Sequence, residues 1–514
     1  MSAVDVKVGD VWHHNLSDWS VVADSTPLIP GDTTGGAGAM SFTLPETPST
    51  RVLKGKPVTL RDAEMGTTTG ELGLGSGNGV NASVTGLSKI AKLNVTRTAE
   101  AYSGTLRGAI LYYLGLCGIT TNIVVSAAAS ARPVNYIGWE GNVLDHLKDL
   151  CIAQQIALSL IGDKYAFRTL TGCSVISARS FADYSWSASE GQLAQNVEVA
   201  WSKTFAPANQ LIYPVGGWNE DVQVFQVDAN EIVEYNIDLT PDEDTSGAYG
   251  ISATSILQPS VVDSVLREYV GSASVYAVSG KDNLPIKAAQ WKAGGGDMKL
   301  ELLDGGSRIK VTITGPSDEQ YAPYQISMTA SEGDYSSLRI YGTGMLYQRS
   351  VLRMSTGLSA DRAPQEVAPI VEMPFLNSYE QAWRAAQALL SRHSSATYSI
   401  TGTIGTIETL FTTPEAFFGG EVVAQQDPAT HPLGNLEGSF FVADGLLFRI
   451  RSVTYAPDGA TFKAEQHCGG PWWSSMFDFA TRTTIRTAAQ WNDFHPAGIT
   501  AGELSANPMN GASA

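Results

Sequence analysis

Cysteine and histidine, the side chains that most often bind transition metals, show no metal-binding spacing in this chain. The cysteines are Cys117, Cys151, Cys173 and Cys468, and the histidines are His13, His14, His146, His393, His431, His467 and His495. There is no His-Glu-x-x-His segment, so a zinc hydrolase is not predicted. We interpret the adjacent pair His467-Cys468 as the end of a strand and the thiols as reduced core residues.

Two segments have the composition of ligand-binding loops but lack an essential part. Gly73, Gly75, Gly77 and Gly79 could cradle a phosphate, yet a nucleotide loop needs a helix after it, and here a strand is expected to follow. The string is therefore interpreted as a flexible loop. The run from Asp242 to Gly247 opens like a calcium loop, but the twelfth position is an alanine where a bidentate glutamate is required. It is interpreted as a solvated acidic turn.

The sequence also contains no short motif that is typical of a hydrolase. No Gly-x-Ser-x-Gly segment is present, and a pair of catalytic carboxylates cannot be selected among 51 acidic residues. We therefore assign no catalytic, cofactor-binding or metal-binding residue and predict that the chain is not an enzyme.

Aromatic residues are the remaining candidates for recognition. Trp472 and Trp473 could anchor a subunit interface, lie in a core or bind sugar, and all three interpretations stay open. A second set, comprising Trp291, Tyr321, Tyr324 and Tyr347, would supply the contacts if the chain binds a receptor or glycan.

Composition limits the class of protein. Of 514 residues, 43% are hydrophobic, 16% are charged and 51 are glycine, which favours several β-rich domains joined by tight turns. The net charge of −18 argues against a surface that binds duplex DNA through its phosphates. The N-terminal residues do not resemble a signal peptide, and the longest apolar stretch is about half of a ~20-residue membrane span, so we expect no stable membrane insertion.

The periodicity of apolar residues predicts a β-barrel or sandwich over 1–100 and an α+β domain over 101–185. In the second region, helices are expected at 104–118 and, capped by Asn142, at 143–155. A hairpin is expected to follow, with strands at 156–161 and 165–170.

Strands dominate the rest. Residues 186–227 and 376–475 are expected to form a second β-barrel, interrupted by an inserted β-rich domain at 228–375, and 476–514 to form an extended tail. Asp304-Gly305-Gly306 predicts a hairpin turn inside the insertion. One late helix is predicted at 378–393.

The order of these segments resembles the hub, or tail-associated, proteins of long-tailed bacteriophages, which include minor tail proteins of actinobacterial phages. The resemblance rests on a helix and hairpin like NVLDHLKDLCIAQQIALSLIGDKYAFRTL, strands like NVEVAWSKTFAPANQLIYPV, a late helix like SYEQAWRAAQALLSR, the segment FFGGEVVAQQ and a final strand pair like LFRIRSVTYAPDGATFKAEQH. The chain departs from the simplest pattern by its insertion and by having no recognisable peptidase or lysozyme domain.

The resemblance implies a structural homotrimer with two barrels per chain. Six barrels would form a pseudo-six-fold ring that adapts a hexameric tail tube to a three-fold tip and lines the DNA channel. The implied partners are the distal tail protein, the tape measure protein and other minor tail proteins. The implied location is the tail tip of the virion, after assembly in the host cytoplasm. The alternatives are a receptor- or glycan-binding tip protein and a tail-associated hydrolase.

Overall fold

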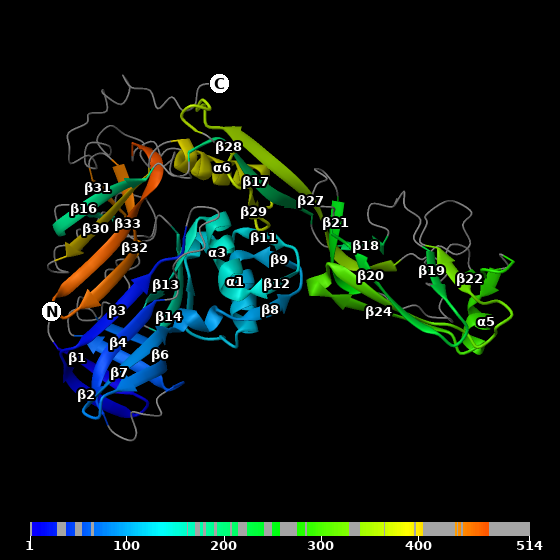
Figure 1. Cartoon of the computed structure of the whole chain (residues 1–514), viewed down its shortest axis with the longest axis horizontal. Helices are drawn as coiled ribbons and strands as arrows, with labels where there is room; N and C mark the ends of the chain where they lie inside the picture. Colours follow the sequence, from blue (N-terminus) through cyan, green and yellow to red (C-terminus); the bar gives the residue numbers. More distant parts are fainter. Residues whose placement is uncertain are drawn as a thin grey trace.

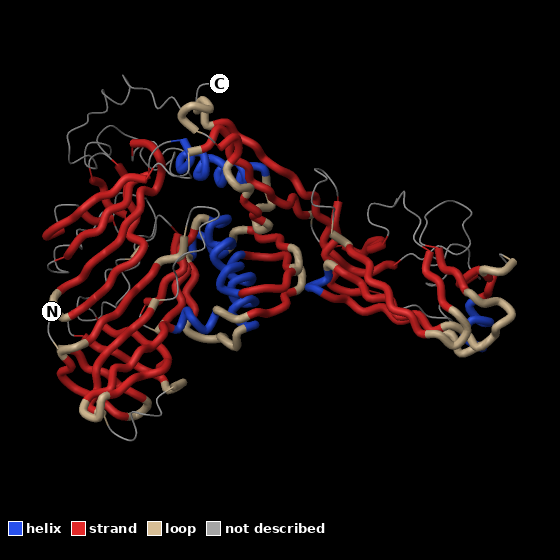
Figure 2. The backbone as a smooth tube through the Cα atoms, in the orientation of Figure 1, coloured by secondary structure: helices blue, strands red, loops and turns tan. Residues whose placement is uncertain are grey.

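The computed structural model describes most of the chain up to residue 471. The described residues are 3–27, 38–46, 54–62, 66–161, 163–169, 175–177, 181–189, 193–205, 208–213, 224–240, 249–256, 275–282, 285–327, 340–363, 365–394, 397–404, 437–438, 440–443 and 446–471. They form a mainly β protein, as predicted, with a long two-part sheet, a helical unit beside it and an arm that projects away from both (Figures 1 and 2).

The two ends of the described chain share one 13-stranded sheet, here called sheet A. Its first half contains β1 (Val4–Val8), β2 (Val11–Leu16), β3 (Trp19–Asp24), β4 (Ala39–Pro45), β5 (Pro57–Asp62), β6 (Gly66–Gly77) and β7 (Asn81–Ser88). Its second half contains β15 (Val175–Ser177), β16 (Phe181–Ser189), β30 (Thr397–Ile404), β31 (Phe440–Ala443), β32 (Leu446–Ala456) and β33 (Gly459–Pro471). Antiparallel pairing of β3 with β32 joins the halves, with Val21 opposite Tyr455 and Asp24 opposite Ser452.

Sheet A differs from the two barrels that the sequence predicts. Its strand order runs as an open path from β16 to β2, and no closed barrel is present among the described strands. The reason is that β3 pairs with β4 on one edge and with β32 on the other, so β3 has no edge left for β2. A single apolar core extends beneath both halves, including Val21 and Phe42 from one half and Val453 and Phe462 from the other.

The predicted glycine loop is wrong, because Gly73, Gly75 and Gly77 lie within strand β6. Glycine at these positions lets β6 pack closely against β7. A Cβ atom on Gly75 would lie 3.0 Å from the carbonyl oxygen of Ser83, across a register shift between β6 and β7. Only Gly79, with φ of +89°, lies in the turn that follows.

Residues 89–169 form the α/β unit, which matches the predicted helices and hairpin closely. Its elements are η2 (Lys89–Leu93), β8 (Thr96–Ala99), β9 (Tyr102–Thr105), α1 (Leu106–Leu116), β10 (Ile123–Val125), α2 (Ala127–Ser130), β11 (Pro133–Tyr136), β12 (Trp139–Asn142), α3 (Val143–Gln154), β13 (Ile156–Ile161) and β14 (Lys164–Thr169). The late helix is α6 (Tyr379–Ser394), and its buried residues Ala382, Ala386 and Leu389 join the same apolar core as α1 and α3.

Helix α3 begins at the predicted cap. The Asn142 side chain accepts hydrogen bonds from the backbone N–H groups of Leu144, at 2.9 Å, and Asp145, at 3.4 Å.

Replacing Asn142 by alanine should lower the free energy of unfolding by about 1 kcal/mol, measured by chemical denaturation. Asn142→Ser keeps a capping oxygen but loses the contact with Asn94. Equal losses in the two variants would show that the Asn94 contact matters and the cap does not.

The arm is attached through a six-stranded sheet around β27 (Ile340–Ser355). The first half of β27 pairs with β18 (Ala208–Tyr213) and β21 (Tyr249–Ile256), whereas the second half pairs with β17 (Ala194–Thr204). Two short strands, β28 (Gln365–Val367) and β29 (Val371–Met373), run parallel to β17. The segment NVEVAWSK, expected in the second barrel, therefore pairs with β27 and lies outside sheet A.

Two smaller sheets complete the arm. One contains β19 (Val224–Val227), β22 (Val275–Ser279), β23 (Pro285–Lys287) and β26 (Tyr324–Ser327); the other contains β20 (Ile232–Asp238), β24 (Asp297–Leu303) and β25 (Arg308–Thr314). Helix α5 (Ala288–Ala293) packs near β22 and β23, and η6 (Asp304–Gly306) is the predicted hairpin turn. The arm has an apolar core of its own, separate from that of the α/β unit.

Candidate functional site

The predicted ligand-binding residues do not come together in the part of the chain that the structure describes. No group of three or more His, Cys, Asp or Glu side chains could hold a metal ion among those residues. Cys151 is buried and Cys117 is half-buried, and burial raises the pKa of the Cys151 thiol to about 12. His467 and Cys468 lie in strand β33. Several candidates lie outside the described residues, namely Cys173, Asp242 to Gly247, His431, Trp472, Trp473 and His495.

The aromatic set proposed for receptor or glycan contact is mostly internal. Trp291 and Tyr324 are each 1% exposed and pack edge to face in the arm core, with ring centroids 5.3 Å apart. Tyr347 is 4% exposed, and Tyr321 is half-buried against the same core. The expectation that this set supplies contacts to a receptor or glycan is therefore wrong for its three buried members, because Trp291 and Tyr324 lie in the arm core and Tyr347 is also inside the protein.

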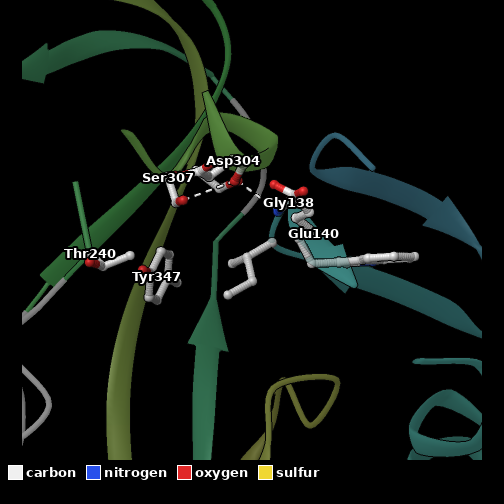
Figure 3. A pocket seen from close by; sticks show the side chains of 9 residues that line it. Gly138, Glu140, Thr240, Asp304, Ser307 and Tyr347 are labelled. Atoms are coloured by element: carbon white, nitrogen blue, oxygen red, sulfur yellow. Dashed lines mark hydrogen bonds between the residues drawn. The ribbon is translucent and has the colours of Figure 1, made fainter. Parts of the chain in front are cut away.

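A hollow lies where the arm meets the α/β unit (Figure 3). It has a volume of about 450 Å³. Its walls come from both parts, with Ile137, Gly138, Trp139 and Glu140 from the α/β unit and Thr240, Ser252, Asp304, Ser307 and Tyr347 from the arm side. Asp304 forms an ion pair with Arg308 at 3.0 Å, so this carboxylate serves the arm hairpin.

Backbone contacts between glycines hold the arm against the α/β unit at this hollow. The Ser252 hydroxyl accepts a hydrogen bond from Gly138 N–H at 2.6 Å and lies 3.3 Å from the Gly305 carbonyl oxygen, to which it donates. A Cβ atom on Gly138 would come within 1.7 Å of that oxygen. Gly305 has φ of +66°, so glycine is needed there for conformation as well as space. The sequence predicts the turn at Gly305 but gives no signal for its contact with Gly138, which is 167 residues away.

An aromatic cluster joins the α/β unit to the segment that precedes α6. The rings of Tyr136 and Phe375 stack with centroids 3.2 Å apart, and Trp139 stacks on His146 at 3.8 Å. The Tyr136 hydroxyl and His146 Nδ1 are 3.2 Å apart. Such a cluster fixes the relative positions of β11, β12 and α3.

Burial shifts the pKa values of two side chains on α3, His146 and Asp149, in opposite directions. It lowers the pKa of His146 from its ordinary 6.5 to about 4, and it raises the pKa of Asp149 from 3.8 to about 7. As pH falls from 6.5 towards 4, the unfolded chain binds a proton at His146 that the folded chain does not, so this residue destabilises the fold on acidification. Asp149 stabilises the fold below pH 3.8, and this contribution is lost as pH rises through 7.

We therefore expect the pH dependence of unfolding to change in opposite senses in two variants. His146→Gln should lose less stability than the wild type between pH 6.5 and 4, whereas Asp149→Asn should lose less stability as pH rises from 4 to 7. Chemical denaturation across this range is the measurement. Identical pH profiles for all three proteins would contradict the two assignments.

A third junction, here called the seam, connects sheet A to the α/β unit through Ser25 and Thr26. Arg449 of β32 donates hydrogen bonds to the Thr26 carbonyl oxygen, at 2.8 Å, and to the Ser25 hydroxyl. Leu158 N–H of β13 donates to the Thr26 hydroxyl at 3.0 Å. Two consecutive residues thus tie the C-terminal strands and the α/β unit to the end of β3.

Buried charges surround the seam. Glu437, Arg168 and Arg449 are all buried, and burial raises the pKa of Glu437 while the nearby arginines oppose that rise. The Arg168 guanidinium also donates to the Ser159 hydroxyl at 3.0 Å. Such groups are stable in an interior when partners of opposite charge and hydrogen bonds surround them. The contacts of all three junctions join one part of the fold to another.

Within the described ranges, none of the helices combines the length and the apolar composition that crossing a membrane requires.

No protein-family model matches the chain, and neither does any curated protein sequence. Solved structures with some likeness include the prophage tail protein gp18 from Listeria monocytogenes EGD-e, with 5% identity and a TM-score of 0.40 over 91% of this chain and 96% of that chain. The 43 kDa tail protein of prophage MuSo2 from Shewanella oneidensis has 11% identity and a TM-score of 0.37, covering 91% of this chain and 98% of its own.

A third likeness is to the E. coli c3393 protein, described as a component of the type VI secretion system with structural similarity to T4 bacteriophage tail proteins gp27 and gp5. It has 12% identity and a TM-score of 0.24, covering 62% of this chain and 76% of that chain. At these TM-scores, none of the three likenesses assigns the chain to a family.

Proposed function

We propose that this chain is a structural subunit of a long-tailed bacteriophage that forms the hub of the tail tip. The observation that carries the proposal is the pairing of β3 with β32, which places an N-terminal and a C-terminal set of strands edge to edge in one sheet. The ordered sequence segments that resemble hub proteins supply the helix, hairpin and late helix between these two sets. A chain with two such sheet halves suits a ring in which three copies supply six units.

In this proposal three copies adapt a six-fold tail tube to a three-fold tip, with the distal tail protein, the tape measure protein and other minor tail proteins as neighbours. Closed cyclic symmetry is the common arrangement of soluble homo-oligomers. The protein would act at the tail tip of the virion without catalysis.

The outer face of sheet A suits a wall past which DNA moves. Opposite its apolar core, each half of the sheet presents several hydroxyl side chains, and at the join Thr454 of β32 lies opposite Val22 of β3. The hydroxyl side chains are Ser185, Thr401, Thr403, Thr461, Thr454, Ser20, Ser41, Thr85 and Ser83, and none of them is buried. This face also carries Lys463, which lies opposite Thr401. On a chain of net charge −18, a surface made mainly of hydroxyl groups attracts phosphates weakly. We propose that this face lines the channel.

Light scattering of the purified full-length protein, together with negative-stain images, tests the proposal. The expected particle has a mass near three times 54.6 kDa and a central hole. A protein that remains monomeric over a wide range of concentration, and also after mixing with its distal tail protein, would contradict the hub assignment.

A further inference from the structure

We infer that the two open edges of sheet A join copies of this chain head to tail, with β16 of one copy pairing with β2 of the next. The inference rests on the proposed function in one respect, because it supplies the contact through which three copies would form a ring. It assigns that contact to two named strands and gives their relative direction.

The two strands lie at opposite ends of sheet A (Figure 1). Among the described strands, β16 pairs only with β30, and β2 pairs only with β1. Each strand therefore has one edge that no described strand covers, and such an edge is a template for a strand of another chain. Because the two edges belong to different strands, the contact is heterologous, and a heterologous contact whose rotation closes gives a ring.

Both faces of each edge strand are uncovered as well. On β16, the consecutive residues Ser185, Trp186, Ser187 and Ala188 are all exposed, and on β2 none of the six residues is buried. Trp186 is 65% exposed, and Val11 at the start of β2 is 59% exposed. Tryptophan is one of the side chains that interfaces favour most, and apolar surface at an edge is removed from water when a second strand covers it.

The two edge strands also lack the residues that usually protect an open edge. Neither FADYSWSAS in β16 nor VWHHNL in β2 contains a lysine or a proline, and β16 has a single charged residue, Asp183. The edge strand β24 of the arm differs, because it exposes Asp297, Lys299 and Glu301. The edges of sheet A are therefore better suited to pairing with another chain than this edge of the arm.

The strand order gives the direction of the contact. The path from β16 to β2 contains eleven strands, and each runs antiparallel to its neighbours. Because the number is odd, the first and the last strand run the same way along the sheet. Rotation about a ring axis keeps that direction, so β16 and β2 of neighbouring copies meet in parallel.

Light scattering of three full-length variants tests this contact. Trp186→Lys places a charge on the β16 edge, and Val11→Lys places one on the β2 edge. The matched control is Tyr379→Lys, which replaces an aromatic residue that is 61% exposed in α6, outside sheet A. We expect both edge variants to stay monomeric and Tyr379→Lys to assemble as the wild type does. All three side chains are exposed, so circular dichroism spectra should be unchanged.

A mixture of the two edge variants makes the test specific for a head-to-tail contact. Val11→Lys keeps an intact β16 edge and Trp186→Lys keeps an intact β2 edge, so one copy of each can form a single contact. The expected product has twice the mass of 54.6 kDa and does not grow further. Dimers of Val11→Lys alone would show that β16 pairs with itself and would overturn the inference.

The remaining outcomes separate this contact from the proposed function. If Trp186→Lys and Val11→Lys both assemble like the wild type, the contact lies elsewhere and the inference is wrong, whereas the three-copy hub is unaffected. If both variants abolish an oligomer that does not contain three copies, the contact is supported and the hub proposal fails. A wild type that stays monomeric at every concentration, alone and with its distal tail protein, contradicts both.

Discussion

Replacing Arg449 by alanine is expected to lower the local free energy of unfolding at the seam by about 3–5 kcal/mol. The guanidinium is 2% exposed and donates to Ser25 and Thr26, so its removal leaves these acceptors inside the protein without that donor. The buried carboxyl of Glu437 also loses a neighbouring cation. Native-state hydrogen exchange of β3 and β32 is the measurement, because it reports the stability of one region separately from the rest of a multi-domain chain.

Two comparisons make this result specific. Arg449→Lys keeps the charge but cannot reach two acceptors with a planar fork, so it should fall between the wild type and alanine. Arg353→Ala removes a half-exposed arginine of β27 that lies 3.6 Å from Glu198 and from Glu366, and it should cost about 1 kcal/mol or less. Equal losses for Arg449→Ala and Arg353→Ala would contradict the structural role given to the seam.

Replacing Phe375 by alanine is expected to cost about 3–5 kcal/mol, the usual range for removing a buried ring. Phe375 is 1% exposed, stacks on Tyr136 and packs edge to face on Tyr113 with centroids 6.1 Å apart. Its loss opens a cavity between the α/β unit and the segment that leads into α6. The measurement is chemical denaturation, with hydrogen exchange of α1 and α6 showing whether both sides of the cavity loosen.

Tyr379→Ala is the matched control for this prediction. The side chain is an aromatic residue four positions further along, but it is 61% exposed at the start of α6. Its removal should change stability by no more than about 0.5 kcal/mol. If Tyr379→Ala and Phe375→Ala were equally mild, the aromatic cluster would not be what holds α6 to the α/β unit.

Local structure was the most predictable part of this protein. Asn142 caps α3 as expected, because a short polar side chain satisfies backbone N–H groups without any tertiary partner. The turn at residues 304–306 forms the expected hairpin, since the positive φ angles of Gly305 and Gly306 follow from residue type. The glycine string in β6 was misread, because close packing against β7 favours small residues as strongly as a loop does.

The candidate junctions could not be found in this way. Arg449 of β32, which bonds to Ser25 and Thr26, is more than 400 residues away from them. Gly138 and Gly305 are 167 residues apart. The residue type of a tryptophan does not show whether it is buried, so Trp291 was a candidate contact under the receptor- or glycan-binding alternative, whereas it lies in the arm core.

By itself, the sequence determined the β-rich class, the helices and hairpins of the α/β unit and the lack of a recognisable catalytic motif. Each of these depends on residue type, periodicity or spacing within a few turns of chain. Only the tertiary structure decided that β3 pairs with β32, that β17 pairs with β27, and that the arm meets the α/β unit through glycines. Edge-to-edge strand pairing uses backbone groups that every residue has, so the choice of partner depends on which edges the packed cores leave open.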